Sequence, residues 1–258
     1  MSVGKVYLVG AGPGDPGLLT LKGKEILQMA DVVVHDALVS PEILAMINPQ
    51  AIVIDSGKRR GLHSRPQDET NEILTAQAQH HAIVVRLKGG DPFTFGRGGE
   101  EMEFLIRAGV SVEVVPGVTS GIAAPAYAHI PITHRNYSSS VTFVTGHESA
   151  GKYRPEVNWS ALAQASETIV IYMGIHNLPT IVAHLRTAGL EASTPIALIR
   201  WGTTSKQEEL IGSLGTIVTQ VEQTEFKSPA IAVVGNVVNF RNAVSPVSVE
   251  IQDEGLDC

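Results

Sequence analysis

The segment at residues 82–108 places the strongest constraint on how this chain can fold. Residues 82–87 form an apolar run that is typical of a buried strand. Glycine then becomes frequent, and residues 102–108 return to helical spacing behind Glu100 and Glu101, which fall in the first turn, where the helix dipole favours carboxylates. The pattern predicts a strand, a glycine-rich loop whose backbone can approach a ligand closely, and a helix. Such a loop lies at the carboxyl end of its strand, where open α/β sheets bind ligands.

The rest of the first half repeats this alternation of apolar runs and helical spacing. The runs are short and rich in Val and Ile, which suits a parallel sheet covered by helices on both faces. Ser40 followed by Pro41 is a typical helix start, with a capping side chain and a proline in the first turn. We expect strands at residues 3–9, 31–36, 51–55, 82–87 and 111–115, and helices at 18–29, from 41, at 68–80 and at 102–108.

A second unit is expected after the pair formed by Pro116 and Gly117. The alternation of residues 205–217 favours antiparallel pairing, so its sheet is expected to be mixed. The fold class is therefore α/β with two domains, a mostly parallel one over residues 1–115 and a mixed one over 116–241. Residues 242–258 have no clear period and are expected to fray. The small residues between positions 121 and 128 predict a tightly packed helix that leads into the second unit. The other elements expected there are strands at 140–145, 168–173, 195–200, 207–211 and 230–234, and a helix at 176–188.

Composition argues against several classes of protein. The chain has 43% hydrophobic and 17% charged residues, as globular proteins do, and no apolar run approaches the roughly 18–20 residues that span a bilayer. The N-terminal segment enters a strand directly, so we expect no signal peptide, a cytoplasmic location and no membrane partner. The one cysteine, Cys258, permits neither a disulfide framework nor a cysteine metal site. No paired His or acidic residues recur at ligand spacing, so no metal is expected.

The distribution of charge favours a small anionic ligand. The net charge of −7 argues against a nucleic-acid partner. Seven of the nineteen Lys and Arg residues nevertheless fall within forty positions. A local basic cluster on an acidic protein favours an anionic small molecule over a polyanion. The members of this cluster are Lys58, Arg59, Arg60, Arg65, Arg86, Lys88 and Arg97.

The loop after the first expected strand, GAGPGD at residues 10–15, matches a dinucleotide-binding turn only in part. That turn has the pattern G-x-G-x-x-G. Here the third glycine comes one residue early, Pro13 removes an amide donor, and Asp15 puts a carboxylate where a phosphate would lie. Asp36 is spaced to reach a ribose hydroxyl, which keeps NAD open as a ligand. A ligand with a sugar and a base but no phosphate fits better, and S-adenosylmethionine is such a ligand.

Longer stretches carry a resemblance to a known family. The two glycine-rich loops read VGAGPGDPGLLTLK over residues 9–22 and VRLKGGDPFTFGRGGEE over residues 85–101. With these motifs the chain resembles the uroporphyrinogen-III C-methyltransferases of the tetrapyrrole methylase superfamily, from about residue 3 to residue 240. The GRGGEE and THR segments are the most specific. Shorter matches are DALVS at 36–40, GKR at 57–59, VPGVT at 115–119, PITHR at 131–135, VTGH at 144–147, YMG at 172–174 and SPA at 228–230.

The resemblance implies a fold, a reaction and a cofactor. Two α/β domains would hold S-adenosylmethionine in the cleft between them, in a homodimer. Methyl groups would pass to C2 and C7 of uroporphyrinogen III, giving precorrin-2 by way of precorrin-1, with S-adenosylhomocysteine as the second product. Carried over position by position, the residues that would line the cofactor are Pro13, Gly89, Gly90, Asp91, Thr94, Thr119, Ser120, Met173, Gly202 and Ala230.

The resemblance also implies catalytic and substrate-binding residues. The family's acid/base pair maps to Asp36 and Lys58, and a carboxylate can accept the proton that the macrocycle loses after alkylation. Arg97 is a third catalytic candidate, although a guanidinium rarely deprotonates and suits a substrate carboxylate better. Glu100 either accepts hydrogen bonds from pyrrole N–H groups or only caps its helix. The expected substrate contacts are Arg97, Glu100, His134, Arg135 and His147.

Other functions stay open on the sequence. Another methylase of the same fold would act on a later corrin intermediate, on RNA or on a modified protein residue, although the GRGGEE and THR segments argue against this. An NAD-dependent oxidoreductase and a tetrapyrrole carrier without turnover are the alternatives from other classes. The sequence does not distinguish whether the product feeds sirohaem, cobalamin or haem d1 synthesis.

Overall fold

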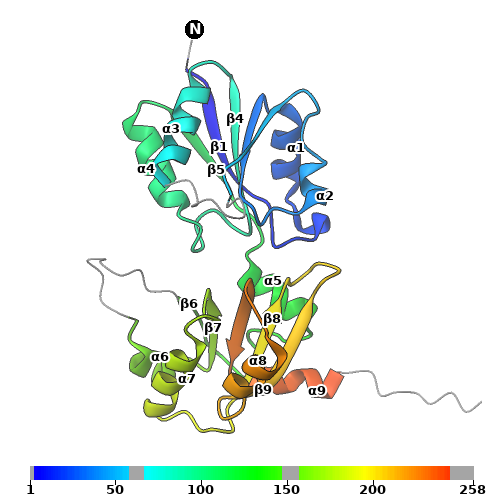
Figure 1. The fold of residues 1–258 in the computed structure, drawn as a ribbon, viewed down its shortest axis with the longest axis vertical. Coiled ribbons are helices and arrows are strands. Elements are labelled where there is room, and N and C mark those ends of the chain that lie inside the picture. The colour runs from blue at the N-terminus through cyan, green and yellow to red at the C-terminus, as the bar shows by residue number, and fades with distance from the viewer. Residues whose placement is uncertain (1–2, 58–66, 147–156, 245–258) are drawn as a thin grey trace, which may run out of the picture.

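The computed structural model describes residues 3–57, 67–146 and 157–244. Two five-stranded sheets follow one another along the chain (Figure 1). The first half contains the strands β1 (Lys5–Gly10), β2 (Val32–His35), β3 (Ile52–Asp55), β4 (Ile83–Lys88) and β5 (Ser111–Val115). Its helices are η1 (Pro16–Leu18), α1 (Leu21–Met29), α2 (Pro41–Leu44), α3 (Gln67–Ala78) and α4 (Gly98–Arg107).

The first sheet is parallel throughout, with the strand order β3-β2-β4-β1-β5. Successive side chains of a strand point to opposite faces, and helices cover both of them (Figure 1). Val9 packs with Leu27 of α1 on one face, whereas the neighbouring Leu8 packs with Leu105 of α4 on the other. Ser40 caps α2, as its sequence predicts. The expected parallel sheet between helices is confirmed.

The second half has a mixed sheet with the strand order β6-β7-β10-β8-β9. β6 pairs with β7 in parallel, whereas β10 is antiparallel to β7 and β8, and β9 is antiparallel to β8. The expected mixed sheet is confirmed. The strands are β6 (Val141–Thr145), β7 (Thr168–Tyr172), β8 (Pro195–Arg200), β9 (Glu208–Ser213) and β10 (Ala230–Val234). The helices are α5 (Ser120–Tyr127), α6 (Trp159–Ala165), α7 (Leu178–Thr187), α8 (Ile217–Thr224), η2 (Asn236–Asn239) and α9 (Phe240–Val244).

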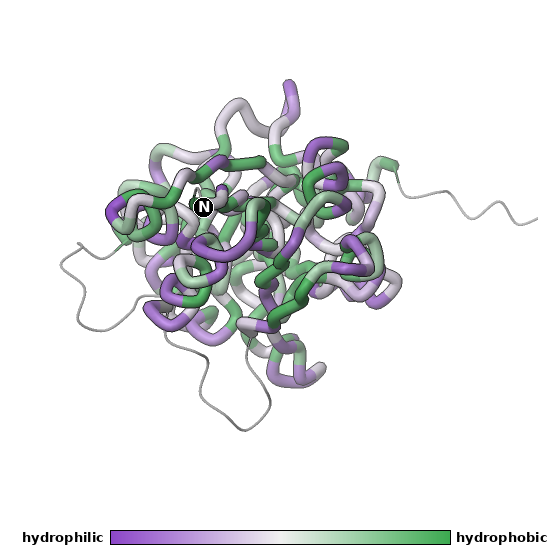
Figure 2. The backbone as a smooth tube through the Cα atoms, turned by 90° about the horizontal axis from the view of Figure 1, so that it is seen from above, coloured by the Kyte–Doolittle hydropathy of each residue, from purple (hydrophilic) through white to green (hydrophobic). Residues whose placement is uncertain are grey.

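Helices also cover both faces of the second sheet. Ile171 packs with Leu185 of α7 on one face, and Val170 packs with Ala124 of α5 on the other. Viewed from above, many of the hydrophobic segments of the chain lie toward the middle of the molecule (Figure 2). Within the described ranges, no helix combines the length and the apolar character that crossing a membrane requires.

In the described part of the second half, the sequence pattern does not predict the helices α6, α8, η2 and α9. α6 is short and depends on its cap, because Asn158 Oδ1 accepts from Ala161 N at 3.0 Å, and on the burial of Trp159. α8 buries Ile217 in the same way. Periodicity is read over about 11–18 residues and does not register such short elements. α9 continues to Val244, past the position where fraying was expected to begin, and residues 245–258 lie outside the described residues.

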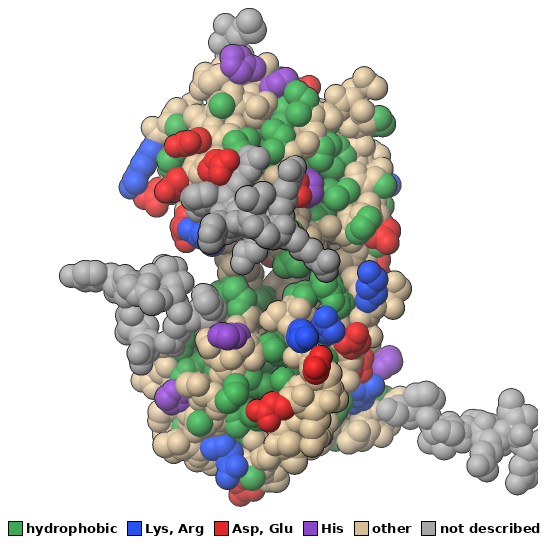
Figure 3. Space-filling view, viewed as in Figure 1, with side chains coloured by type: hydrophobic (Ala, Val, Ile, Leu, Met, Phe, Trp, Pro, Cys, Tyr) green, Lys and Arg blue, Asp and Glu red, His purple; other side chains and the backbone are tan. Residues whose placement is uncertain are grey.

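Three loops of the first half meet where it joins the second half. A Cβ atom on Gly117 would lie 2.3 Å from Gly90 O, and one on Gly10 would lie 2.5 Å from Gly117 N. Gly12 and Gly90 exchange backbone hydrogen bonds of 3.0 and 2.7 Å. The loops that follow β1, β4 and β5 therefore pack together in direct backbone contact. Figure 3 shows a recess between the two halves of the molecule.

Gly117→Ala should lower the free energy of unfolding by about 1–3 kcal/mol, because the new methyl group meets backbone atoms that cannot rotate away. Gly99→Ala is the matched control. A Cβ atom on Gly99 has nothing within 4 Å, and alanine is favoured over glycine in a helix. Urea denaturation of the two variants measures the difference. Equal stability of both would contradict the close packing of this junction.

Candidate functional site

The carboxyl edge of the first sheet meets one edge of the second sheet. The register pairs Tyr172 at the end of β7 with Ile231, and Arg200 at the end of β8 with Ala230. The ends of β7 and β8 and the start of β10 therefore share one edge. This edge touches the loop after β1, since a Cβ atom on Gly14 would lie 2.5 Å from Thr204 Cγ2.

Asp15 ties the loop after β1 to the second half. Its N–H donates to Thr203 Oγ1 at 3.1 Å, and its carboxylate accepts from the Tyr127 hydroxyl and from Gly17 N, each at 2.6 Å. The hydrogen bond from Tyr127, and after it the one from Gly17, lowers the pKa of Asp15. The carboxylate of Asp15, which stands where a dinucleotide-binding loop would hold a phosphate, is therefore hydrogen-bonded to protein groups.

Asp91 organises the loop after β4. Its Oδ1 accepts from the N–H groups of Phe93 and Thr94 at 2.9 Å and from Thr94 Oγ1 at 3.0 Å. Its Oδ2 accepts from Gly117 N at 3.1 Å, which joins this loop to the end of β5. Beside it, Gly90 has a left-handed φ of +69°, and the nearest atoms to its Cβ position belong to Thr119 and Ser120 at 3.8 to 3.9 Å. The loop after β4 thus leaves space next to the start of α5.

Tyr172 holds the start of α5 from the second sheet. Its hydroxyl accepts from Gly121 N at 2.9 Å and lies 2.7 Å from Thr119 Oγ1. Burial raises the pKa of this tyrosine. On its other side the ring lies 4.8 Å, between centroids, from the ring of Phe95 in the loop after β4. Tyr172 therefore links the second sheet, α5 and the loop after β4.

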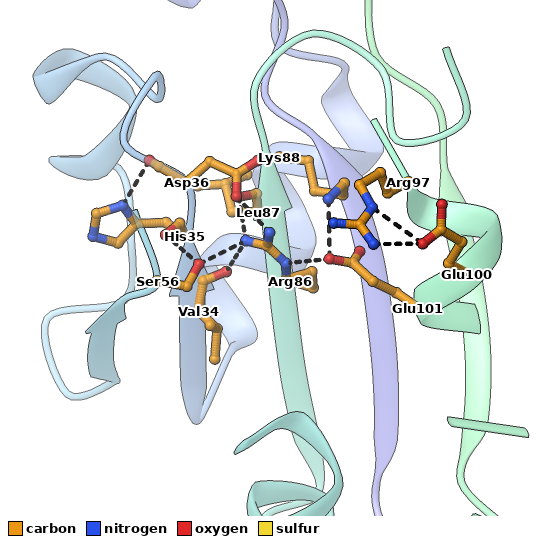
Figure 4. A network of polar contacts seen from close by, with 10 residues as sticks. All are labelled: Val34, His35, Asp36, Ser56, Arg86, Leu87, Lys88, Arg97, Glu100 and Glu101. Carbon is orange, nitrogen blue, oxygen red and sulfur yellow. Dashed lines mark hydrogen bonds and ion pairs between the residues drawn. The ribbon is translucent and has the colours of Figure 1, made fainter. Parts of the chain in front are cut away.

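Asp36 follows β2 and is the first member of a row of charges across the first sheet (Figure 4). Its Oδ1 accepts from Arg86 Nη2. Arg86 Nε donates to Glu101 Oε1 at 3.0 Å, and Lys88 Nζ donates to the same oxygen at 3.1 Å. Arg86 Nη1 also donates to Ser56 Oγ at 3.2 Å. The row alternates in sign and joins β2, β4 and α4.

Arg86 and Lys88 are buried, which corrects the interpretation of the basic cluster. Only 5% and 4% of their side chains are exposed, and both meet Glu101. Burial is the main cause that lowers the pKa of Lys88, and the positive charge of Arg86 lowers it further. Charged side chains this deep require partners, so these two cations belong to the interior of the first half. Lys58, Arg59, Arg60 and Arg65 lie outside the described residues.

Arg97 lies at the start of α4 with a left-handed φ of 60°. Its side chain is 53% exposed and donates to Glu100 Oε2 from Nη2 at 2.6 Å and from Nε at 3.1 Å. No side-chain hydrogen bond from residue 97 caps the helix. The Glu100 side chain therefore orients the guanidinium of Arg97 at the surface.

His134 and Arg135 lie in a turn of the second half. The His134 ring packs against Tyr137 and against Phe240 of α9, with centroids 5.0 Å apart in each case, and its Nδ1 accepts from Asn136 N at 3.2 Å. Arg135 is exposed. These contacts of His134 lie within the second half, whereas Arg97 lies in the first half. The other two expected site residues, Lys58 and His147, lie outside the described residues.

The residues expected to line a cofactor gather around the junction of the two halves. Pro13 lies in the loop after β1, Gly89, Gly90, Asp91 and Thr94 in the loop after β4, Thr119 and Ser120 at the start of α5, and Met173, Gly202 and Ala230 at the shared edge of the second sheet. Among residues 3–57, 67–146 and 157–244, no group of three or more His, Cys, Asp or Glu side chains is arranged to hold a metal ion.

The sequence pattern does not predict that Glu101 and Tyr172 make contacts that organise the site. A signal existed for Glu101, because Arg86 and Lys88 are two apart in an apolar strand and so point to one face. Two buried cations on one face predict a carboxylate on the helix that covers it. Tyr172 gave no such signal, since it is the last residue of a fully buried strand.

Comparison with known proteins identifies the class. The family model Tetrapyrrole (Corrin/Porphyrin) Methylases matches residues 5–218. The chain therefore belongs to the tetrapyrrole methylases, and the resemblance noted in the sequence is confirmed.

Individual relatives show which members of this family the chain is similar to. A uroporphyrinogen-III C-methyltransferase from Synechocystis sp. is 65% identical over 249 residues, which cover 95% of each chain. One from Priestia megaterium is 50% identical over 238 residues, which cover 92% of this chain and 100% of the relative. The crystal structure of uroporphyrin-III C-methyl transferase from Thermus thermophilus, complexed with S-adenyl homocysteine, superposes with a TM-score of 0.78 at 38% identity, over 92% of this chain and 99% of that one.

Tyr172→Phe should lower the free energy of unfolding by about 1–3 kcal/mol, because it leaves the buried N–H of Gly121 without its acceptor. Tyr127→Phe is the control, since it removes a hydroxyl that bonds Asp15 at the exposed surface and should cost less. Thermal or urea unfolding compares the two variants. A larger loss in Tyr127→Phe would show that the start of α5 does not depend on Tyr172.

Proposed function

We propose that this protein is an S-adenosylmethionine-dependent methyltransferase that methylates uroporphyrinogen III at C2 and C7 and gives precorrin-2 by way of precorrin-1. The observation that carries the proposal is the 65% identity, along almost the whole of both chains, to a relative with the name of that enzyme. Family membership also explains why the loop after β1 departs from the dinucleotide pattern. The NAD-dependent oxidoreductase is therefore not retained.

The junction of the two halves fits a cationic nucleoside ligand. Gly90 leaves space beside the start of α5, and Met173 is 49% exposed at the facing edge of the second sheet. Residues 89–96 contain no Lys or Arg, and Lys88 just before them is buried against Glu101, so the loop presents no charge suited to phosphate. When bound, S-adenosylmethionine would supply a methyl group on its sulfonium, and an electron-rich carbon of the substrate would attack that methyl group in line, with S-adenosylhomocysteine as the leaving group.

Each proposed cofactor residue acts through its place in the junction. Asp91 acts by folding the loop after β4, because both of its carboxylate oxygens accept hydrogen bonds from protein groups. Thr119 acts at the start of α5, where Tyr172 holds it. The proposed lining is Pro13, Gly89, Gly90, Asp91, Thr94, Thr119, Ser120, Met173, Gly202 and Ala230.

Asp36 is the proposed proton acceptor. Its side chain is 33% exposed at the carboxyl end of β2, while Arg86 holds one of its oxygens. A carboxylate in this position can take the proton that the alkylated macrocycle loses. Lys58 is proposed as its partner in acid/base chemistry.

The substrate carries many carboxylates, and exposed cations would bind them. Arg97 is proposed to make a bidentate contact, for which its planar guanidinium is suited. A substrate carboxylate at Arg97 would compete with Glu100, whose carboxylate is also proposed to accept from a pyrrole N–H. His134, Arg135 and His147 are proposed as further substrate contacts.

We also propose that the protein works as a homodimer in the cytoplasm, without a nucleic-acid or membrane partner. The family resemblance supports the homodimer, and the net charge of −7 argues against nucleic acid. The proposed domains are residues 1–115 and 116–241, with a tail at 242–258. Their boundary lies between β5 and α5, and α5 packs on the second sheet.

Purified protein should convert uroporphyrinogen III and S-adenosylmethionine, under anaerobic reducing conditions, to a product heavier by two methyl groups. Mass spectrometry measures the product, and a reaction without S-adenosylmethionine is the control. An unchanged mass in the complete reaction would contradict the proposed function.

The loop after β4 should divide into a cofactor part and a substrate part. Gly90→Leu should weaken S-adenosylhomocysteine binding about 10-fold or more, because a left-handed φ costs an L-residue roughly 1–2 kcal/mol and the side chain enters the open space. Arg97→Ala should keep that affinity within about twofold and raise the KM for the tetrapyrrole about 10-fold, as the loss of a charged hydrogen bond does. Calorimetry and steady-state kinetics measure these changes. Equal loss of cofactor binding in both variants would refute the division.

A further inference from the structure

The proposed proton acceptor belongs to a chain of four alternating charges. Asp36 is bonded to Arg86, Arg86 to Glu101, and Glu101 to Lys88 (Figure 4). The side chain of Asp36 is 33% exposed, those of Arg86 and Lys88 are 5% and 4% exposed, and that of Glu101 is 0% exposed. The exposed end of this chain is therefore anchored by a carboxylate with no access to water.

Glu101 reaches both cations with the same oxygen, Oε1. The distances are 3.0 Å to Arg86 Nε and 3.1 Å to Lys88 Nζ. Arg86 and Lys88 would repel one another at this depth, so the charge of Glu101 is what allows both to stay. Leu105, one turn along α4 on the same face as Glu101, is fully buried and keeps the helix against the sheet.

The guanidinium of Arg86 is fixed by more than one group. Nε meets Glu101, and Nη1 donates to Ser56 Oγ at 3.2 Å and to Val34 O at 3.4 Å. Ser56 Oγ in turn donates to His35 O at 2.9 Å, on the residue before Asp36. Nη2 is the nitrogen directed to the Asp36 carboxylate. A planar fork held at Nε and Nη1 can present Nη2 in only one direction.

We propose that Glu101 is a positioning residue that fixes the direction of the Asp36 carboxylate through Arg86. This inference rests on the proposed function, because it takes Asp36 as the group that accepts the proton. Glu101→Gln keeps the shape of the side chain but removes the charge shared by Arg86 and Lys88. The two cations then move apart, Arg86 turns, and Asp36 loses its fixed direction. Misplacement by about 1 Å can cost on the order of 100-fold in rate.

The test is a double-mutant cycle on turnover of uroporphyrinogen III. Asp36→Asn should lower kcat by about 10²–10⁴-fold, the range for general base catalysis. Glu101→Gln should lower kcat by about 10- to 100-fold and leave S-adenosylhomocysteine affinity within about twofold. If Glu101 acts through Asp36, the double variant should be no slower than Asp36→Asn alone, within about twofold.

Glu103→Gln is the matched control. Glu103 lies on the same helix, is exposed and pairs with Arg107 at 2.5 Å, so its loss should leave kcat within about twofold of the wild type. Melting temperatures of all variants are recorded in the same buffer. Should Glu101→Gln not fold, Arg86→Lys takes its place in the cycle, because lysine keeps the charge but cannot reach Asp36 and Glu101 with one fork.

Three results would overturn the inference and leave the proposed function standing. The first is wild-type turnover in Glu101→Gln, and the second is a double variant whose loss equals the product of the two single losses. A fall in S-adenosylhomocysteine affinity as large as the fall in kcat would also overturn it, since Glu101 would then support the whole fold. Absence of turnover in the wild-type protein would overturn the proposed function and this inference with it.

Discussion

Close contact of backbone with backbone at Gly10, Gly90 and Gly117 is the constraint on which the rest of the arrangement depends. A side chain at Gly10 or Gly117 would displace main-chain atoms, so the loops after β1, β4 and β5 can meet only where glycine is present. Asp91 fastens this meeting point by accepting from Gly117 N. Because β5 leads directly into α5, the same point also places the second sheet relative to the first.

The buried charges of the first half are proposed to serve orientation more than stability. Burying Arg86, Lys88 and Glu101 costs several kcal/mol for each ion before their attraction is counted, and apolar side chains of similar volume would often be as stable. What the buried charges supply is direction, because each has few hydrogen-bonding geometries. The last group in this row is the carboxylate of Asp36, which is the only partly exposed member of the row among the described residues. A carboxylate that accepts a proton, the role proposed for Asp36, gains from this, since a small misplacement is costly in rate.

The sequence predicts the strands and their loops well because both have strong local signals. The bounds of β5, β8 and β10 agree with the apolar runs at 111–115, 195–200 and 230–234. The candidate site is harder, because its side chains come from distant segments. Arg86 and Lys88 look like surface cations until α4 is placed over their face of the sheet, and only that packing brings in Glu101 from 13 to 15 residues away. The link from Tyr172 to Thr119 spans 53 residues and has no local pattern at all.

The cofactor is proposed to bind where the loop after β4 meets the second sheet. Hydrogen–deuterium exchange with and without S-adenosylhomocysteine measures this. On binding, exchange should slow in peptides that cover residues 89–96, 117–121 and 172–174, with β3 and α7 unchanged. Protection confined to α6 and α7, with unchanged exchange in the loop after β4, would contradict it.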